Sequence, residues 1–102
     1  MPITSKQRAQ LRAIATGIDT IFQVGKGGIN DALVESVSNA LRAREIVKGR
    51  VLETCEYSPR EALAKLAAAC KAEEVQAIGT KIVLYKRNEK EPKIVLVKDK
   101  KK

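Results

Sequence analysis

The sequence predicts an α/β fold in which helices cover a mixed four-stranded sheet, with the element order α-β-α-β-α-β-β. Capped amphipathic segments alternate with short runs rich in β-branched residues. Strands separated by helices favour parallel pairing, whereas the last two runs flank Gly79-Thr80 and must add an antiparallel pair. With 102 residues, the chain is long enough for one modest hydrophobic core.

The first helix is expected to begin after Thr4 or Ser5 and to end near Gly17. Gln7 follows Thr4 at the spacing of a capping box, in which each side chain bonds the other's backbone N–H. One face of this helix is apolar and carries Leu11, Ile14, Ala15 and Ile18. The helix should therefore pack on the sheet through that face.

The middle of the chain predicts a strand, a helix and a second strand. Residues 20–24 are rich in β-branched and aromatic side chains, as strands are. Asn30 is the candidate N-cap of the following helix, which has acidic residues near its start and basic residues near its end, as the helix dipole favours. Residues 46–52 predict the second strand.

The last third of the chain predicts a helix followed by a hairpin. Ser58 is a candidate cap, Pro59 suits the first helical position, and Glu61 completes a capping box. Two strands follow, at 74–78 and 81–86. We expect a domain over residues 1–87 and a basic C-terminal tail over 88–102, in which the apolar run 94–97 can form a short extra strand.

Composition limits the classes of function. The formal net charge is +8, from 20 Lys and Arg against 12 Asp and Glu, which favours polyanionic partners. No apolar run has the length of a membrane-spanning helix, and the N-terminus lacks the apolar core of a signal peptide, so we expect a cytoplasmic protein with no membrane partner.

The side-chain inventory argues against catalysis. The chain has no histidine, and its two cysteines, Cys55 and Cys70, are too few for a tetrahedral zinc set. We therefore expect no enzyme activity, metal, cofactor or small-molecule substrate, and two reduced thiols in or near the core. The three aromatic residues, Phe22, Tyr57 and Tyr85, are too scattered to form a base-stacking platform.

The connection between the first strand and the second helix, Gly25-Lys26-Gly27-Gly28, is the candidate functional motif. Glycines let a phosphate approach the backbone near a helix N-terminus, and lysine adds a positive charge. The spacing fails the P-loop and dinucleotide-binding patterns but fits a G-x-x-G loop, which clamps a nucleic-acid backbone in KH domains. A left-handed turn that needs glycine for backbone reasons remains the alternative.

Four segments, TSKQRAQLRAIA, IFQVGKGGIN, ALRAREIVKGRVLE and VQAIGTKIVLYKR, occur in collinear order across residues 4–87. Through them the chain resembles a stand-alone CRM domain, of the chloroplast RNA splicing and ribosome maturation family, in its small bacterial YhbY branch. The resemblance implies a fold similar to the C-terminal domain of the third translation initiation factor. It also implies RNA binding through the G-x-x-G loop, association with precursors of large-subunit ribosomal RNA and pre-ribosomal particles, and a role in ribosome assembly. The implied RNA-binding residues are Gly25, Lys26, Gly27 and Gly28, with Lys6, Arg8 and Arg12 of the first helix beside the loop.

Two other functions stay open at this point. The run 94–97 can dock on the ribosome or another protein, which would make the chain a protein-interaction module. Alternatively, the net charge alone can make it a nonspecific nucleic-acid binder. Further basic residues that can extend a basic surface are Lys48, Arg50, Lys81, Lys86 and Arg87.

Overall fold

The computed structural model describes residues 3–88 and residue 94, and its elements follow the predicted order. They are α1 (Ser5–Ala15), β1 (Phe22–Val24), α2 (Asp31–Arg44), β2 (Ile46–Val51), α3 (Pro59–Cys70), β3 (Glu73–Ile78) and β4 (Lys81–Tyr85). The first strand is shorter than predicted, since it begins at Phe22 and not at residue 20. None of the helices among these residues is long and apolar enough to cross a membrane.

The four strands form one mixed sheet in the order β1-β2-β4-β3. β1 runs parallel to β2, whereas β4 runs antiparallel to both β2 and β3. The mixed sheet is thus confirmed, but β2 and β3 do not pair with each other although a helix separates them in sequence. β4 lies between them because it is nearly buried along its length, whereas β3 carries polar residues suited to a sheet edge.

Side chains predicted to cap the helices do so. Thr4 and Gln7 form a reciprocal capping box at α1, with N···O distances of 3.0 and 3.1 Å. Ser58 and Glu61 form another at α3, at 2.9 and 3.2 Å. At α2 the Leu33 N–H donates to Asn30 Oδ1 at 2.8 Å. These local bonds fix where each helix begins.

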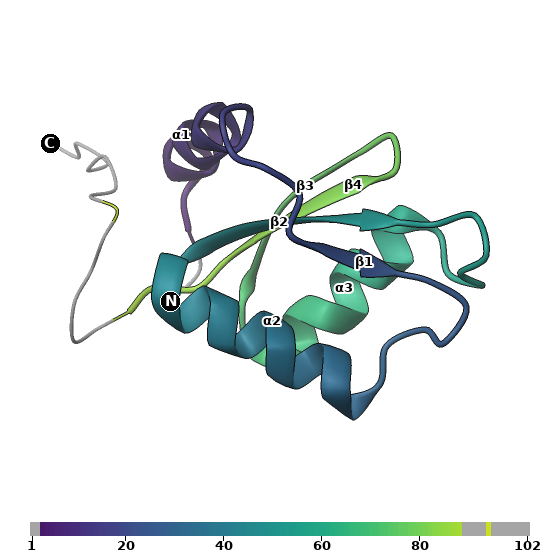
Figure 1. Ribbon diagram of the computed structural model, residues 1–102. Coiled ribbons are helices and arrows are strands. Elements are labelled where there is room, and N and C mark those ends of the chain that lie inside the picture. Colours follow the sequence, from purple (N-terminus) through teal and green to yellow (C-terminus); the bar gives the residue numbers. More distant parts are fainter. Residues whose placement is uncertain (1–2, 89–93, 95–102) are drawn as a thin grey trace, which may run out of the picture.

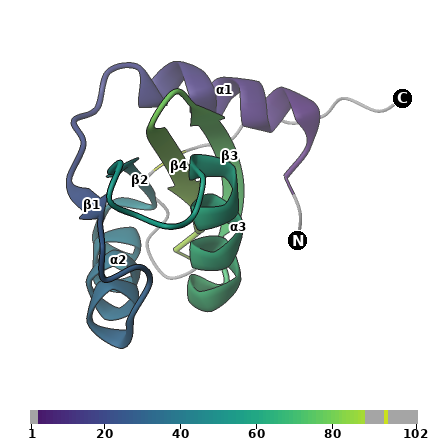
Figure 2. The same ribbon diagram turned by 90° about the vertical axis from the view of Figure 1, so that its right-hand side faces the viewer.

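The helices cover both faces of the sheet (Figures 1 and 2). α1 packs on one face, where Leu11 and Ala15 meet Ile46, Val75, Val83 and Tyr85. α2 and α3 pack on the other face, where a larger cluster includes Val37, Leu41, Leu66, Ile82 and Leu84. The first helix and the helix that follows the glycine loop are therefore on opposite sides of the sheet.

Gly49 in the middle of β2 is required by the packing of a neighbouring ring. Phe22 is its register partner on β1, and a Cβ on Gly49 would lie 2.2 Å from Phe22 Cζ, well inside contact distance. The ring thus lies over the glycine and packs against the larger core cluster. Any side chain at position 49 would displace it.

A buried carboxylate joins the end of α2 to the end of the described chain. Glu45 is fully buried and has a φ of 68°, which is uncommon for a residue with a Cβ. Its carboxylate oxygens accept the backbone N–H of Asn88 at 2.6 Å and of Ile94 at 2.7 Å, and its carbonyl accepts the Lys86 N–H at 2.8 Å. Ile94 also packs against the α1 cluster.

The predicted C-terminal tail can be compared with the structure at two positions only, Asn88 and Ile94. Residues 89–93 and 95–102 lie outside the described residues, as does most of the apolar run 94–97. The side chain of Ile94 is partly buried and packs against the cluster beneath α1. The domain boundary at residue 87 stays a prediction.

The two cysteines are free thiols, as predicted. Cys70 is buried in the larger cluster, and Cys55 packs against it while partly exposed. In the part of the chain that the structure describes, no group of three His, Cys, Asp or Glu side chains is placed to hold a metal ion.

Candidate nucleic-acid interface

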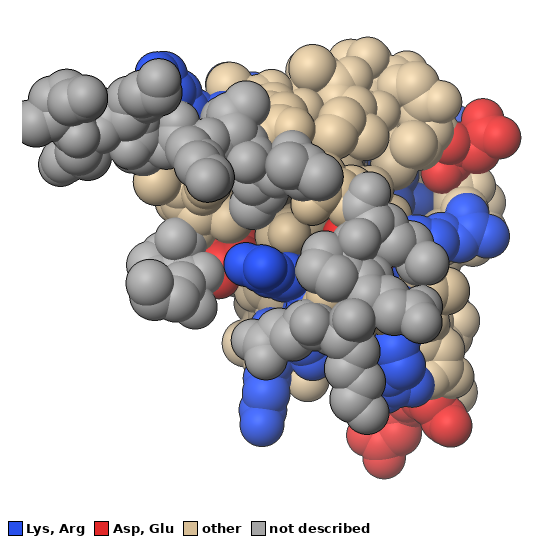
Figure 3. All heavy atoms as spheres, turned by 90° about the vertical axis from the view of Figure 1, so that its left-hand side faces the viewer, with Lys and Arg blue, Asp and Glu red and all other residues tan. Residues whose placement is uncertain are grey.

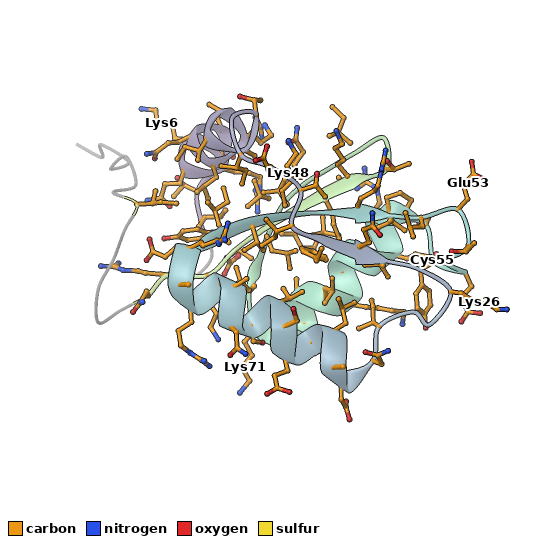
Figure 4. All side chains as sticks on the ribbon, viewed as in Figure 1. Lys6, Lys26, Lys48, Glu53, Cys55 and Lys71 are labelled. Carbon is orange, nitrogen blue, oxygen red and sulfur yellow. The ribbon has the colours of Figure 1, made fainter. Side chains whose placement is uncertain are left out.

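The glycine loop forms a tight turn at the end of β1. The Gly28 N–H donates to the Gly25 carbonyl at 2.9 Å, which closes a four-residue β-turn. Lys26 and Gly27 occupy its two central positions and are exposed. Lys26 projects from one end of the molecule (Figure 4). The turn therefore presents backbone and one cation to solvent at its tip.

The three glycines of this turn differ in whether the backbone conformation requires glycine. Gly28 has a φ of +68°, a conformation that L side chains rarely adopt, so the backbone explains its identity. Gly25 and Gly27 do not have a positive φ. A Cβ on Gly27 would be 3.6 Å from Asn30 Nδ2, and one on Gly25 would be 3.4 Å from Leu52 Cδ1, which are ordinary contacts. The alternative that glycine serves only the turn therefore accounts for Gly28 alone.

The N-terminus of α2 is less available to an anion than the sequence suggests. Asn30 Oδ1 already accepts the Leu33 N–H, one of the donors that a helix leaves unpaired. Asp31 adds an exposed carboxylate in the first turn, where it stabilises the helix dipole and repels another anion. We conclude that Lys26 and the loop backbone must supply more of the attraction for a phosphate than the helix end does.

Acidic and aromatic side chains surround the turn. Glu53, on the connection between β2 and α3, lies at the same end of the molecule as Lys26 (Figure 4). The Tyr57 ring is 3.8 Å from the position of a Cβ on Gly28, and Lys65 Nζ lies 5.0 Å from the centroid of that ring. Tyr57 thus lies against the turn at Gly28, and the charge around the turn is mixed.

The basic residues predicted on the first helix are not beside the loop. Lys6 and Lys26 lie at opposite ends of the molecule (Figure 4). Arg8 and Arg12 line a groove along β3, at one edge of the sheet, whereas the loop follows β1 at the other edge. The expected adjacency is wrong because β2 and β4 lie between β3, where these arginines are, and β1, which the loop follows.

The groove along β3 has its own constellation of charges. Arg60, at the start of α3, joins Arg8 and Arg12 in lining it, together with Glu73 and Glu74. Arg8 Nε donates to the Glu74 carbonyl at 3.2 Å, so part of this guanidinium already serves the edge strand. The sequence gives no signal for Arg60, because only tertiary packing brings the start of α3 to the first helix.

The other basic residues divide into two groups. Lys48 Nζ donates to the carbonyls of Ala15 at 3.0 Å and Ile18 at 3.5 Å, at the end of α1. Lys86 Nζ donates to the Cys70 carbonyl at 3.1 Å, at the end of α3. These two lysines stabilise helix C-termini. Arg50 and Lys81 are exposed on adjacent strands.

Basic side chains also occur away from the loop. The view of the end remote from Lys26 shows Lys and Arg side chains on the surface there too (Figure 3). The net charge of +8 is therefore distributed, and charge by itself does not locate a binding site.

Comparison with known proteins places most of the chain in one family. Residues 3–86 match the CRS1 / YhbY (CRM) domain. The chain is 40% identical over 94 residues to "Probable RNA-binding protein YqeI" of Bacillus subtilis, which covers 92% of this chain and 98% of that protein. It is 33% identical over 102 residues to "Probable RNA-binding protein MJ0652" of Methanocaldococcus jannaschii, which covers 98% of this chain and 75% of that protein.

A solved structure has the same fold. The solution structure of SAV1595 from Staphylococcus aureus matches with a TM-score of 0.79 and 38% sequence identity. The match covers 93% of this chain and 99% of that one. The α/β architecture described above is thus shared with an experimentally determined relative.

Proposed function

Because this chain belongs to the CRS1 / YhbY (CRM) domain family, we propose that it binds RNA through the loop Gly25–Gly28 and assists assembly of the large ribosomal subunit. Several relatives carry names that describe RNA binding, so the proposed role is that of a binding protein and not of an enzyme. The proposed ligand is structured precursor RNA of the large subunit, within pre-ribosomal particles.

One observation carries the assignment to the loop. The conformation of the turn does not require glycine at positions 25 and 27, where the φ is not positive and a Cβ has room. The absence of side chains there leaves the exposed backbone accessible beside Lys26. A bare backbone next to one cation suits contact with a sugar-phosphate chain more than recognition of a base.

The basic residues of α1 would contact parts of the RNA that are remote from the glycine loop. Since Lys6 and Lys26 lie at opposite ends of the molecule, Lys6 would contact a distant part of the same RNA (Figure 4). Arg8 and Arg12 would act from the β3 groove together with Arg60. An RNA that reaches both places must be folded or must wrap around the domain, which favours structured RNA over a short single strand.

The test is ultraviolet crosslinking in cells, followed by sequencing of the RNA recovered with the protein. The loop variant Lys26→Asp/Gly27→Asp is compared with Ser36→Asp/Lys71→Asp, which makes the same change in formal charge at exposed positions away from the loop. We expect wild-type protein and the control to enrich large-subunit ribosomal RNA and the loop variant to lose that enrichment.

Two results would argue against the proposal. Equal recovery by the loop variant and the control would mean that the glycines serve only the fold. Diffuse recovery by the wild-type protein, with duplex DNA competing as well as RNA at equal salt, would indicate nonspecific binding by charge. With ~3 to 5 phosphate contacts, the slope of log affinity against log salt should be roughly −2 to −4.

A further inference from the structure

The sheet face that α1 covers is open at one end, and the residues there form one row across all four strands. The register pairs Gln23 with Arg50, Arg50 with Lys81, and Lys81 with Ile78. Paired residues on neighbouring strands direct their side chains to the same face. We call Gln23, Arg50, Lys81 and Ile78 the open row.

The alternation of side chains fixes which face the open row occupies. In β4, Val83 and Tyr85 belong to the cluster beneath α1, whereas Ile82 and Leu84 belong to the cluster beneath α2 and α3. Lys81 is two residues before Val83, so it lies on the α1 face. The remaining members of the row share that face through the register.

The charged residues of the open row line a hollow. Gln23, Arg50 and Lys81 line it with residues 20–22, and among the described residues no acidic side chain contributes to that lining. Arg50 and Lys81 are both exposed. Lys48, on the same face of β2, is engaged by the C-terminus of α1. The two exposed cations, Arg50 and Lys81, therefore lie where the cover provided by α1 ends.

Exposed apolar side chains lie at both ends of this pair of cations. Among residues 3–88 and residue 94, the large apolar side chains classed as exposed are Ile78, at 60%, and Ile21, at 38%. Ile78 is in the row, and Ile21 lines the same hollow as Gln23. The row thus combines an amide, two cations and apolar surface. These groups can contact the base edges, the phosphates and the base faces of a nucleotide, respectively.

The open row is close to the glycine loop. Gln23 is on β1, two residues before Gly25 at the start of the loop, a separation of about 7 Å at the usual rise of a strand. Adjacent strands are about 4.8 Å apart, so the row extends for about 14 Å from that point. A strand of RNA held at the loop can continue along this row without leaving the surface.

We propose that the open row is a second RNA-contact surface, which binds the nucleotides next to those held by the glycine loop. Arg50 and Lys81 contact phosphates, the Gln23 amide bonds a base edge or a 2′-hydroxyl, and Ile78 packs on a base or ribose. This inference rests on the proposed RNA-binding function, and it identifies the direction in which the RNA runs from the loop.

The experiment measures binding of the full chain to a fluorescein-labelled RNA hairpin with a single-stranded tail of mixed sequence, by fluorescence anisotropy at several salt concentrations. The row variant Arg50→Gln/Lys81→Gln is compared with Arg42→Gln/Lys71→Gln, which removes the same charge at exposed positions lining a different hollow. The loop variant Lys26→Asp/Gly27→Asp is measured in parallel. Circular dichroism confirms that each variant is folded.

We expect the row variant to bind about tenfold more weakly than the control and to lower the magnitude of the salt slope by about 1.4, which corresponds to two phosphate contacts. Ile78→Ser should weaken binding without changing the salt slope, because the contact it removes is apolar. The variant Arg50→Lys should keep the slope while it loses the planar contacts of a guanidinium.

The outcomes separate the row from the loop. If the row variant and its control have the same affinity and salt slope, the open row does not contact RNA, whatever the result for the loop variant. If the row variant binds more weakly and the loop variant binds as the wild type does, RNA contact by the open row is supported and RNA contact by the glycine loop is overturned. A row variant that binds RNA normally but no longer associates with ribosomal particles would identify a protein contact and overturn the inference.

Discussion

The two halves of the sheet face beneath α1 use similar residues for different purposes. In the covered half, Lys48 donates to the Ala15 carbonyl, the last of α1, and Tyr85 is buried in the cluster beneath this helix. In the open half, Arg50 and Lys81 are exposed beside Ile78. Lys48 and Arg50 are two residues apart on one strand and point to the same face.

The position of α1 therefore decides what a basic residue on this face can do. A lysine that meets a helix C-terminus is held by carbonyl groups and the helix dipole, so its charge stabilises the fold. A basic residue beyond the helix keeps its donors for a partner. Substitutions at four places test this difference: at Gly49, at Lys48 and Arg50, in the glycine loop, and at Tyr85.

The largest effect is expected at Gly49, which lies between Lys48 and Arg50 and joins the two halves. Gly49→Ala places a Cβ inside the Phe22 ring contact, so we expect a loss of about 3 kcal/mol in the free energy of unfolding. Urea denaturation measures it. The double variant Gly49→Ala/Phe22→Leu should recover part of the loss, and a wild-type midpoint for the single variant would mean that the ring does not lie over Gly49.

A smaller effect separates the two basic residues directly. Lys48→Met keeps an unbranched apolar stem but removes the donor to the Ala15 and Ile18 carbonyls, so we expect a loss of about 1 kcal/mol. Arg50→Met should change stability by less than about 0.5 kcal/mol, because the side chain is exposed. Equal losses in thermal denaturation would remove the distinction between the halves.

The glycine loop allows a similar separation at the end of the open half. Gly28→Ala should cost about 1 kcal/mol because of its positive φ, whereas Gly27→Ala should leave stability almost unchanged. If the loop binds RNA, Gly27→Ala should nevertheless lower the affinity, since its methyl group occupies the exposed tip. If Gly27→Ala is as destabilising as Gly28→Ala, both glycines are required by the turn conformation, and Gly27 is then not evidence for RNA binding.

The smallest effect concerns Tyr85 in the covered half. Burial, and then the charge of Glu45, raise the pKa of the Tyr85 hydroxyl above its usual value of 10.0, with Arg87 acting in the opposite direction. The folded protein thus retains a proton that the unfolded chain releases, so this residue favours folding less as the pH rises above about 10. Tyr85→Phe should remove that part of the decline.

At neutral pH the same substitution should have almost no cost. The Tyr85 hydroxyl is buried and has no hydrogen-bond partner within the described residues, so removing it leaves no other polar group unpaired. Urea denaturation below and above about pH 10 measures both effects. A loss of more than about 1 kcal/mol at neutral pH would mean that the hydroxyl has a partner.

The local features of this protein follow from its amino-acid sequence. Thr4, Asn30 and Ser58 cap helices because a side-chain oxygen at that position reaches an N–H only a few residues away. Gly79 turns the hairpin with a positive φ for an equally local reason. The element order and the position of the glycine loop follow from such signals, and they could be predicted.

Features that depend on which elements meet became known from the three-dimensional structure. In the structure β4 lies between β2 and β3. Lys6 (Figure 4), Arg8 and Arg12 are remote from the loop, and Arg60 lines the same groove as Arg8 and Arg12. The structure also shows that the backbone has a positive φ at Gly28, which favours glycine there, and that it does not at Gly25 and Gly27. The physical reason is that burial and charge pairing join residues far apart in the chain, and no local pattern records which face of the sheet a helix will cover.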